Sequence, residues 1–174
     1  EDAKERAASE IPPFFKTNLM LNNAGFSEQD GKVMDQPVGT AQIITGPGKI
    51  VLAADTIVVL NEAIIGKPVH REEAVSILFA LSGEKHKVIT GVVIRKDDQE
   101  IAFADSTEVE FHKLTIEQIE FYVDKYKPYD KAGAYAIQEW IGVVGIKSID
   151  GDFYNVMGLP VRRVVKGLKT LLVK

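Results

Sequence analysis

The sequence predicts an α/β fold in which helices flank a mixed β-sheet. Runs rich in β-branched residues, such as 50–60, have the continuous hydrophobicity of strands that are buried on both faces. Segments such as 72–81 instead repeat their apolar residues with the period of a helix. The two kinds of segment are interleaved along the chain, which is typical of the α/β class.

Length and composition predict one globular domain over residues 1–174. Hydrophobic residues make up 45% of the chain and charged residues 26%, which are ordinary values for a folded protein and exclude general disorder. The formal net charge of −4 argues against a nonspecific nucleic-acid binder, because such proteins usually carry a basic surface. A local group of lysines can still bind a small anionic ligand.

The absence of cysteine excludes disulfides and thiolate metal sites. No stretch approaches the roughly 20 apolar residues that a membrane-spanning helix needs. The charged residues at the start of the sequence show no signal-peptide pattern. We therefore expect a cytoplasmic protein that does not interact with membranes.

Residues 1–49 predict little regular structure, whereas the residues after them show a clear pattern of strands and helices. Within residues 1–49, Pro12-Pro13 and five glycines leave only a short helix ending at Gly25. The later pattern predicts a strand, a helix that stops at Gly83, and two further strands, over 50–60, 72–81, 88–94 and 101–111.

The C-terminal part alternates in the same way. Thr115 opens a helix with a capping-box pattern that includes Gln118, and Pro128 ends it. The apolar stripe of this helix is Ile116, Ile119, Val123 and Tyr126. Two short strands are predicted between 133 and 149, separated near Glu139. A last helix starts at Pro160 and packs inward through Val161, Val164, Val165, Leu168, Leu171 and Leu172.

Asp55 and Thr56 follow the apolar residues 50–54, inside a buried strand or at its end. An ionised carboxylate there costs several kcal/mol unless it is paired, hydrogen-bonded or bound to a metal. Such a carboxylate can hold a metal or accept a proton from water. The alternative is an aspartate that caps backbone amides in a turn. Thr56 alone carries little information, since threonine is common in strands.

Two lysines and a glutamine are candidates for ligand binding. Lys67 lies between glycine and proline in a stiff turn, and Lys131 precedes a run of small residues where a ligand can approach the backbone. Ammonium groups can neutralise phosphates, and the Gln138 amide can read the edge of a base. The alternatives are a solvated loop lysine and a surface turn followed by a closely packed strand.

Other polar residues suggest no metal site. Asp150 and Asp152 lack the remaining pattern of a calcium loop, so we interpret them as part of a turn that leads into the last helix, with Asn155 near the ligand pocket. The three histidines are too widely separated for a zinc site and are expected to be structural or exposed.

Five segments carry a more specific signal together than alone. They are 54–59, 66–68, 81–83 with 90–92, 130–135 with 137–138, and 155–160. In order and spacing they resemble the Maf family of nucleotide pyrophosphatases. The resemblance implies an elongated α/β fold with a central nucleotide-binding cleft, and it suggests a homodimer.

The resemblance also implies an activity. Such an enzyme, with Mg²⁺ or Mn²⁺, hydrolyses the bond between the α and β phosphates of a nucleoside triphosphate to give the monophosphate and pyrophosphate. Asp55 corresponds to the catalytic general base, Lys67 and Lys131 to phosphate-binding residues, and Thr56 and Gln138 to residues that set base preference. The Asp-Thr pair resembles the branch that acts on dTTP, UTP and modified pyrimidine nucleotides. No metal ligands are identified.

Residues 1–49 depart from the family pattern. A Ser-x-Ser-Pro-Arg-Arg loop is not recognisable, and Phe15-Lys16-Thr17 stands where its arginines are expected. Losing two charge-assisted phosphate contacts would cost several kcal/mol of binding or transition-state stabilisation. Two alternatives therefore stay open: a weak or inactive nucleotide-binding regulator, and a structural or interaction protein that nucleotides do not stabilise.

Overall fold

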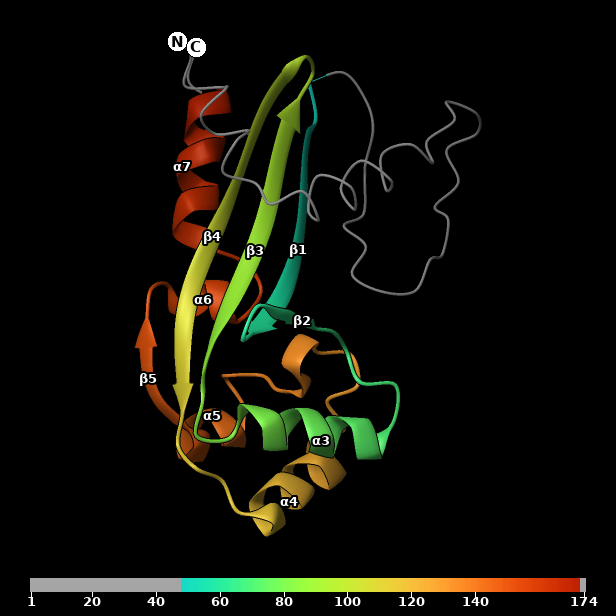
Figure 1. Ribbon diagram of the computed structural model, residues 1–174. Helices are drawn as coiled ribbons and strands as arrows, with labels where there is room; N and C mark the ends of the chain where they lie inside the picture. Colours follow the sequence, from blue (N-terminus) through green and yellow to red (C-terminus); the bar gives the residue numbers. More distant parts are fainter. Residues whose placement is uncertain (1–47, 173–174) are drawn as a thin grey trace. The chain divides into compact units, whose positions relative to one another are not determined.

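The computed structural model describes residues 48–172, which include a five-stranded sheet (Figure 1). Its strands are β1 (Ile50–Leu60), β2 (Ala63–Ile65), β3 (Lys85–Lys96), β4 (Gln99–Phe111) and β5 (Ile146–Asp150). Their spatial order is β2-β1-β3-β4-β5. The predicted α/β class with flanking helices is confirmed.

Short turns determine the strand directions. Asn61 and Glu62, with φ of 48° and 67°, connect β1 to β2, and Asp97 with φ of 51° lies between β3 and β4. Two-residue turns with positive φ join antiparallel neighbours. The pairs β1–β2 and β4–β5 are antiparallel, and β3 and β4 run in opposite directions in Figure 1. The mixed strand directions that we expected are therefore not found among the described residues.

The helices lie between and after the strands along the chain, in the order that the sequence predicted. They are α3 (Arg71–Leu81), α4 (Ile116–Tyr126), the 3₁₀ turn η1 (Ala132–Ala134), α5 (Trp140–Gly145), α6 (Phe153–Val156) and α7 (Val161–Leu172). Within residues 48–172, no helix is long and apolar enough to cross a membrane.

The described chain forms two compact units, and the prediction of a single domain stays a prediction. The first unit contains residues 48–55, 91–104 and 161–172. In it, α7 packs closely against Ile94 at Gly167. A Cβ added at Gly167 would lie only 2.9 Å from Ile94 Cδ1. The Arg163 guanidinium lies 4.5 Å from the centroid of the Phe103 ring and donates to the Ala104 carbonyl at 2.5 Å.

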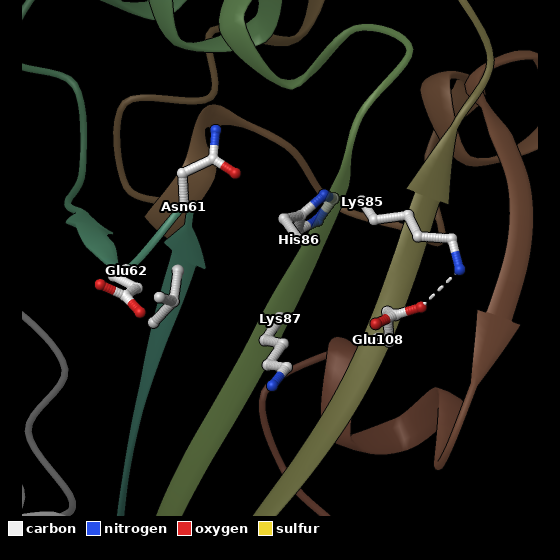
Figure 2. A pocket seen from close by; sticks show the side chains of 7 residues that line it. Asn61, Glu62, Lys85, His86, Lys87 and Glu108 are labelled. Atoms are coloured by element: carbon white, nitrogen blue, oxygen red, sulfur yellow. Dashed lines mark hydrogen bonds and ion pairs between the residues drawn. The ribbon is translucent and has the colours of Figure 1, made fainter.

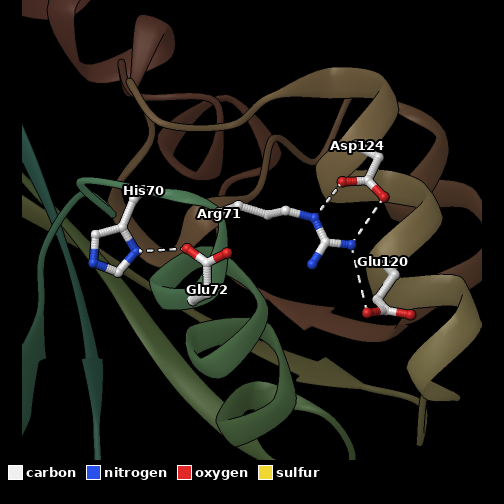
Figure 3. Close-up of polar contacts among 5 residues, drawn as sticks. All are labelled: His70, Arg71, Glu72, Glu120 and Asp124. Atoms are coloured by element: carbon white, nitrogen blue, oxygen red, sulfur yellow. Dashed lines mark hydrogen bonds and ion pairs between the residues drawn. The ribbon is translucent and has the colours of Figure 1, made fainter.

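The second unit contains residues 56–90 and 105–160. Its most deeply buried large side chains are Tyr122, Phe111, Leu78, Leu81, Ile119 and Ile141. On its surface, Arg71 of α3 donates to Asp124 of α4 at 2.5 and 2.9 Å and to Glu120 at 3.4 Å (Figure 3). The Arg71 guanidinium lowers the pKa of the Asp124 carboxyl. These contacts fix how α3 and α4 align, although exposed ion pairs add little stability.

Most predicted elements of residues 50–172 are confirmed. The strands agree within a few residues, and the capping box joins Thr115 and Gln118 through hydrogen bonds in both directions. The first of the two strands predicted between 133 and 149 is wrong, because η1 and the turn that precedes Glu139 occupy that stretch. The second is correct only in its last residues, since α5 occupies 140–145 and β5 begins at Ile146. The short helix predicted to end at Gly25 lies outside the described residues.

Two predicted apolar stripes need correction. In α4, Ile116 is exposed and Tyr122 is buried instead, since positions 119, 122, 123 and 126 share the inner face. In α7, only Val164, Gly167 and Leu171 are buried. Val161, Val165 and Leu172, which we expected to pack inward, are exposed in the described structure.

His86 of β3 is buried, whereas the other two histidines are exposed. Its Nε2 pairs with the Tyr135 hydroxyl at 2.7 Å, and its Nδ1 finds no partner within residues 48–172. Burial lowers the pKa of the His86 imidazole from 6.5 to about 4. The side chain is therefore neutral at pH 7 and belongs to the core.

This burial predicts a loss of stability in acid. Between the folded pKa of about 4 and the ordinary value of 6.5, the unfolded chain binds more protons, so stability falls as the pH decreases through that window. The loss amounts to at most about 3 kcal/mol. Urea unfolding from pH 7 to pH 4 measures it. In His86→Gln we expect a flatter pH slope, whereas His112→Gln, at an exposed position, keeps the slope of the unchanged chain.

Candidate functional site

Strand β1 carries Asp55 and Thr56 at its middle. Both are half-buried, and the strand continues through Ile57 and Val58, which are buried. Asp55 is thus part of a strand and does not lie in a turn. The structure places Asp55 in the first unit and Thr56 in the second.

Thr56 contacts the segment 155–160 that the sequence singled out. Its hydroxyl lies 2.9 Å from the Thr90 hydroxyl of β3 and donates to the Gly158 carbonyl at 3.3 Å. Thr90, which is fully buried, donates in turn to the Asn155 carbonyl at 3.4 Å. Three of the predicted motif segments therefore meet at one hydrogen-bonded group.

Asn155 fixes that segment from the inside. It is fully buried, and its amide nitrogen donates to the Val88 carbonyl and the Thr107 hydroxyl, both at 3.0 Å. The Asp152 carboxylate accepts from the backbone amides of Tyr154 at 2.7 Å and Asn155 at 3.2 Å. Asp152 is consequently the N-cap of α6, in agreement with its interpretation as a turn residue.

The two candidate lysines lie in neighbouring segments. The Gly133 amide donates to the Gly66 carbonyl at 3.1 Å, which aligns the chain beside Lys67 with the chain beyond Lys131. Gly133 has φ of 72°, and a Cβ there would lie 2.9 Å from Val58 Cγ2, so only glycine fits this approach to β1.

The Asp130 carboxylate neutralises part of the positive charge of Lys67 and Lys131. Lys131 Nζ lies 3.0 and 3.1 Å from the two Asp130 oxygens, and the Lys131 side chain is 25% exposed. The pKa of the Asp130 carboxyl is lowered, first by this bond and further by the charge of Lys67. Two ammonium groups against one carboxylate leave a net positive charge, which suits an anionic ligand.

Gln138 lies at the tip of a tight turn. It is exposed, and it follows Ile137, which is 5% exposed. The Glu139 amide donates to the Ala136 carbonyl at 3.0 Å and closes the turn around Gln138. The Gln138 amide is therefore presented to solvent from a well-packed backbone.

The described residues contain no cluster of three histidine, aspartate or glutamate side chains that could hold a metal ion. A magnesium or manganese ion that arrives with a nucleotide needs no such cluster. Mg²⁺ is usually bound through one or two carboxylates together with substrate phosphates and water, so a protein cage is not required. Asp55 is the carboxylate of the predicted site that could share such an ion.

A small hollow on the sheet contains none of the five predicted site residues (Figure 2). Its volume is about 170 Å³, and it is lined by Val59, Asn61, Glu62, Lys85, His86, Lys87 and Glu108. Two of its lining residues, Lys85 and Glu108, pair at 2.8 Å. Its charges are nearly balanced, so it does not resemble a triphosphate site.

Sequence reasoning missed several residues that shape the site. Thr107 and Tyr122 received no role, although both are fully buried and hydrogen-bonded. The signal for Tyr122 was its place three residues after Ile119 and four before Tyr126, on the inner face of α4. Nothing in the local sequence indicates the partner of Thr107, because Asn155 lies 48 residues away.

Comparison with known proteins places these residues in a family context. The sequence profile of the family described as Maf-like protein matches residues 27–171. Three bacterial proteins named dTTP/UTP pyrophosphatase are similar to the chain. The one from Bacteroides thetaiotaomicron is 50% identical over 128 residues, the one from Parabacteroides distasonis 52% over 121, and the one from Cytophaga hutchinsonii 50% over 125.

The matches cover a larger share of this chain than of the three relatives. They include 74%, 70% and 72% of this chain, in the same order. They include 66%, 63% and 57% of the three relatives, so the chain spans less than two thirds of the length of each.

Proposed function

The chain belongs to the Maf-like protein family, and we propose that it acts as a nucleoside triphosphate pyrophosphatase on dTTP, UTP and modified pyrimidine nucleotides. The observation that carries this proposal is the hydrogen bond between Gly133 and Gly66, which aligns the segments of Lys67 and Lys131 beside each other. The name shared by the three relatives supports the choice of substrate.

Each predicted site residue has a separate role in the proposed reaction. Asp55 accepts a proton from water, whose oxygen attacks phosphorus while the bridging bond between the α and β phosphates breaks. The products are a nucleoside monophosphate and pyrophosphate. Lys67 and Lys131 bind the phosphate oxygens and stabilise the charge that develops on them. Thr56 and Gln138 contribute to base preference.

The proposal includes Mg²⁺ or Mn²⁺. When bound, such an ion neutralises charge on the triphosphate oxygens. The protein's own share is the positive charge of Lys67 and Lys131, which the Asp130 carboxylate offsets only in part. A nucleotide that displaces Asp130 from Lys131 would gain the full charge of that ammonium group. A homodimer and a cytoplasmic location remain predictions.

A panel of nucleotides tests the proposed function. We expect pyrophosphate release from UTP and dTTP with kcat/KM at least about 10-fold above that for ATP and GTP, in the presence of Mg²⁺ or Mn²⁺. Equal rates with all bases would contradict the pyrimidine assignment. Nucleotides that raise the melting temperature without pyrophosphate release would instead favour the non-catalytic regulator.

The role of Gln138 gives a more specific prediction. Gln138→Ala removes an exposed amide and no packing, so we expect the preference for UTP over other bases to fall about 10-fold while triphosphate binding is retained. The measurement is kcat/KM across the nucleotide panel, with inhibition by inorganic tripolyphosphate as the probe of phosphate binding. An equal loss for every nucleotide would remove Gln138 from base recognition.

A further inference from the structure

We propose that Tyr122 and Glu139 are positioning residues that set the location of Gln138, and through it the base preference of the site. This inference rests on the proposed function and extends it to two residues that touch no substrate. Its basis is the way a single buried hydroxyl group is bonded to both sides of the Gln138 turn.

The Tyr122 hydroxyl connects the two ends of the turn. Tyr122 projects from α4 and is fully buried. Its oxygen accepts a hydrogen bond from the Ala136 amide at 3.1 Å and donates one to the Glu139 carboxylate. Residues 136 and 139 lie on either side of Gln138, so both ends of its turn are bonded to the same atom.

Backbone bonds complete the turn. The Glu139 amide donates to the Ala136 carbonyl at 3.0 Å, and the Gly142 amide donates to the Glu139 carbonyl at 2.9 Å as α5 begins. Within this frame Gln138 is exposed, while its neighbour Ile137 is buried. These bonds fix the Gln138 backbone and so the point from which its exposed side chain extends.

Helix α4 is a firm support for this arrangement. The Tyr122 ring stacks on Tyr126 with centroids 4.9 Å apart and an angle of 25° between the rings. Phe121, also from α4, packs edge-on against Trp140 directly after the turn, at 4.9 Å. Burial, followed by the Glu139 carboxylate, raises the pKa of the Tyr122 hydroxyl, so this group remains a neutral donor over the working pH range.

Phosphate binding and base recognition should therefore respond differently to changes at Tyr122 and Glu139. Lys67 lies in another segment, and Lys131 lies before the turn that Ala136 and Glu139 close. We therefore expect phosphate binding to depend less on the Tyr122–Glu139 bond than base recognition does. Hydrogen bonds to a base edge depend steeply on distance and angle, so a displaced Gln138 loses discrimination before the site loses phosphate binding. A purely structural role would weaken both together.

Single substitutions test this difference. For Tyr122→Phe we expect the ratio of kcat/KM for UTP to that for CTP to fall about 5- to 10-fold, with inhibition by inorganic tripolyphosphate unchanged. Tyr126→Phe is the matched control, because it removes a hydroxyl from the stacked ring on the same helix and leaves the Tyr122–Glu139 bond intact. It should keep the ratio of the unchanged chain.

Variants of Glu139 make the test independent of how well Tyr122→Phe folds. Glu139→Ala should lower the ratio to a similar extent, whereas Glu139→Gln, whose side-chain oxygen still accepts a hydrogen bond, should restore most of it. Both substitutions remove the Tyr122–Glu139 bond, and Tyr122→Phe also removes the bond from the Ala136 amide. The double variant Tyr122→Phe with Glu139→Ala should therefore lose no more than Tyr122→Phe alone.

The outcomes separate this inference from the proposed function. Unchanged base preference in both Tyr122→Phe and Glu139→Ala, in an active protein, overturns the inference and leaves the proposed function intact. An equal loss of tripolyphosphate inhibition also overturns it. Failure of the unchanged chain to hydrolyse any nucleotide overturns the proposed function and this inference together.

Discussion

We expect Asp55→Asn to lower nucleoside triphosphate hydrolysis at least about 100-fold while the protein remains folded. The amide cannot accept a proton from water as a carboxylate does, yet it has nearly the same shape and can keep the hydrogen bonds of the strand. Asp55 lies inside β1 and is half-buried, so a substitution of equal size should be tolerated.

Asp98→Asn is the matched control. It makes the same chemical change at an exposed position in the turn between β3 and β4. Its turnover and melting temperature should equal those of the unchanged chain. If Asp55→Asn retained the full rate, Asp55 would have no part in the mechanism. If it unfolded, the carboxylate would be structural.

Gly142→Ala should destabilise the protein strongly, by roughly 3 kcal/mol or more. A Cβ at Gly142 would lie 1.7 Å from the Ile137 carbonyl oxygen and 2.6 Å from its carbon, and these are backbone atoms that cannot rotate away. The turn that carries Gln138 would have to open, which would also weaken the Gly142–Glu139 hydrogen bond.

Urea unfolding of Gly142→Ala and Gly66→Ala measures this effect. The control is matched because a Cβ at Gly66 meets no atom within 4 Å. We expect the stability of Gly66→Ala to stay within about 0.5 kcal/mol of the unchanged chain. Equal stabilities for the two variants would mean that the turn around Gln138 adapts easily, contrary to the packing described above.

The sequence predicted those parts of the fold that depend on local pattern. The run 50–60 became β1 because β-branched residues favour a strand, and Thr115 became a helix cap because Gln118 completes the capping box. The family resemblance rested on motifs that the fold brings together, since Thr56, Thr90 and the Asn155 segment are bonded to one another.

The parts that local pattern could not predict depend on contacts distant in sequence. Residues 140–145 resemble a strand in composition, yet they form α5 because the chain folds back tightly at Gly142 against Ile137. The bond between Tyr122 and Glu139 spans 17 residues and two elements, so no periodicity indicates it. The roles of Asp55, Lys67 and Gln138 in catalysis remain predictions.

The products formed from UTP test the central claim most directly. After incubation with Mg²⁺, the quenched reaction is separated by ion-exchange chromatography, and nucleotides and phosphates are quantified. The proposed function predicts UMP and pyrophosphate in equal amounts, without UDP. UDP with orthophosphate, or UTP that remains intact, would contradict it.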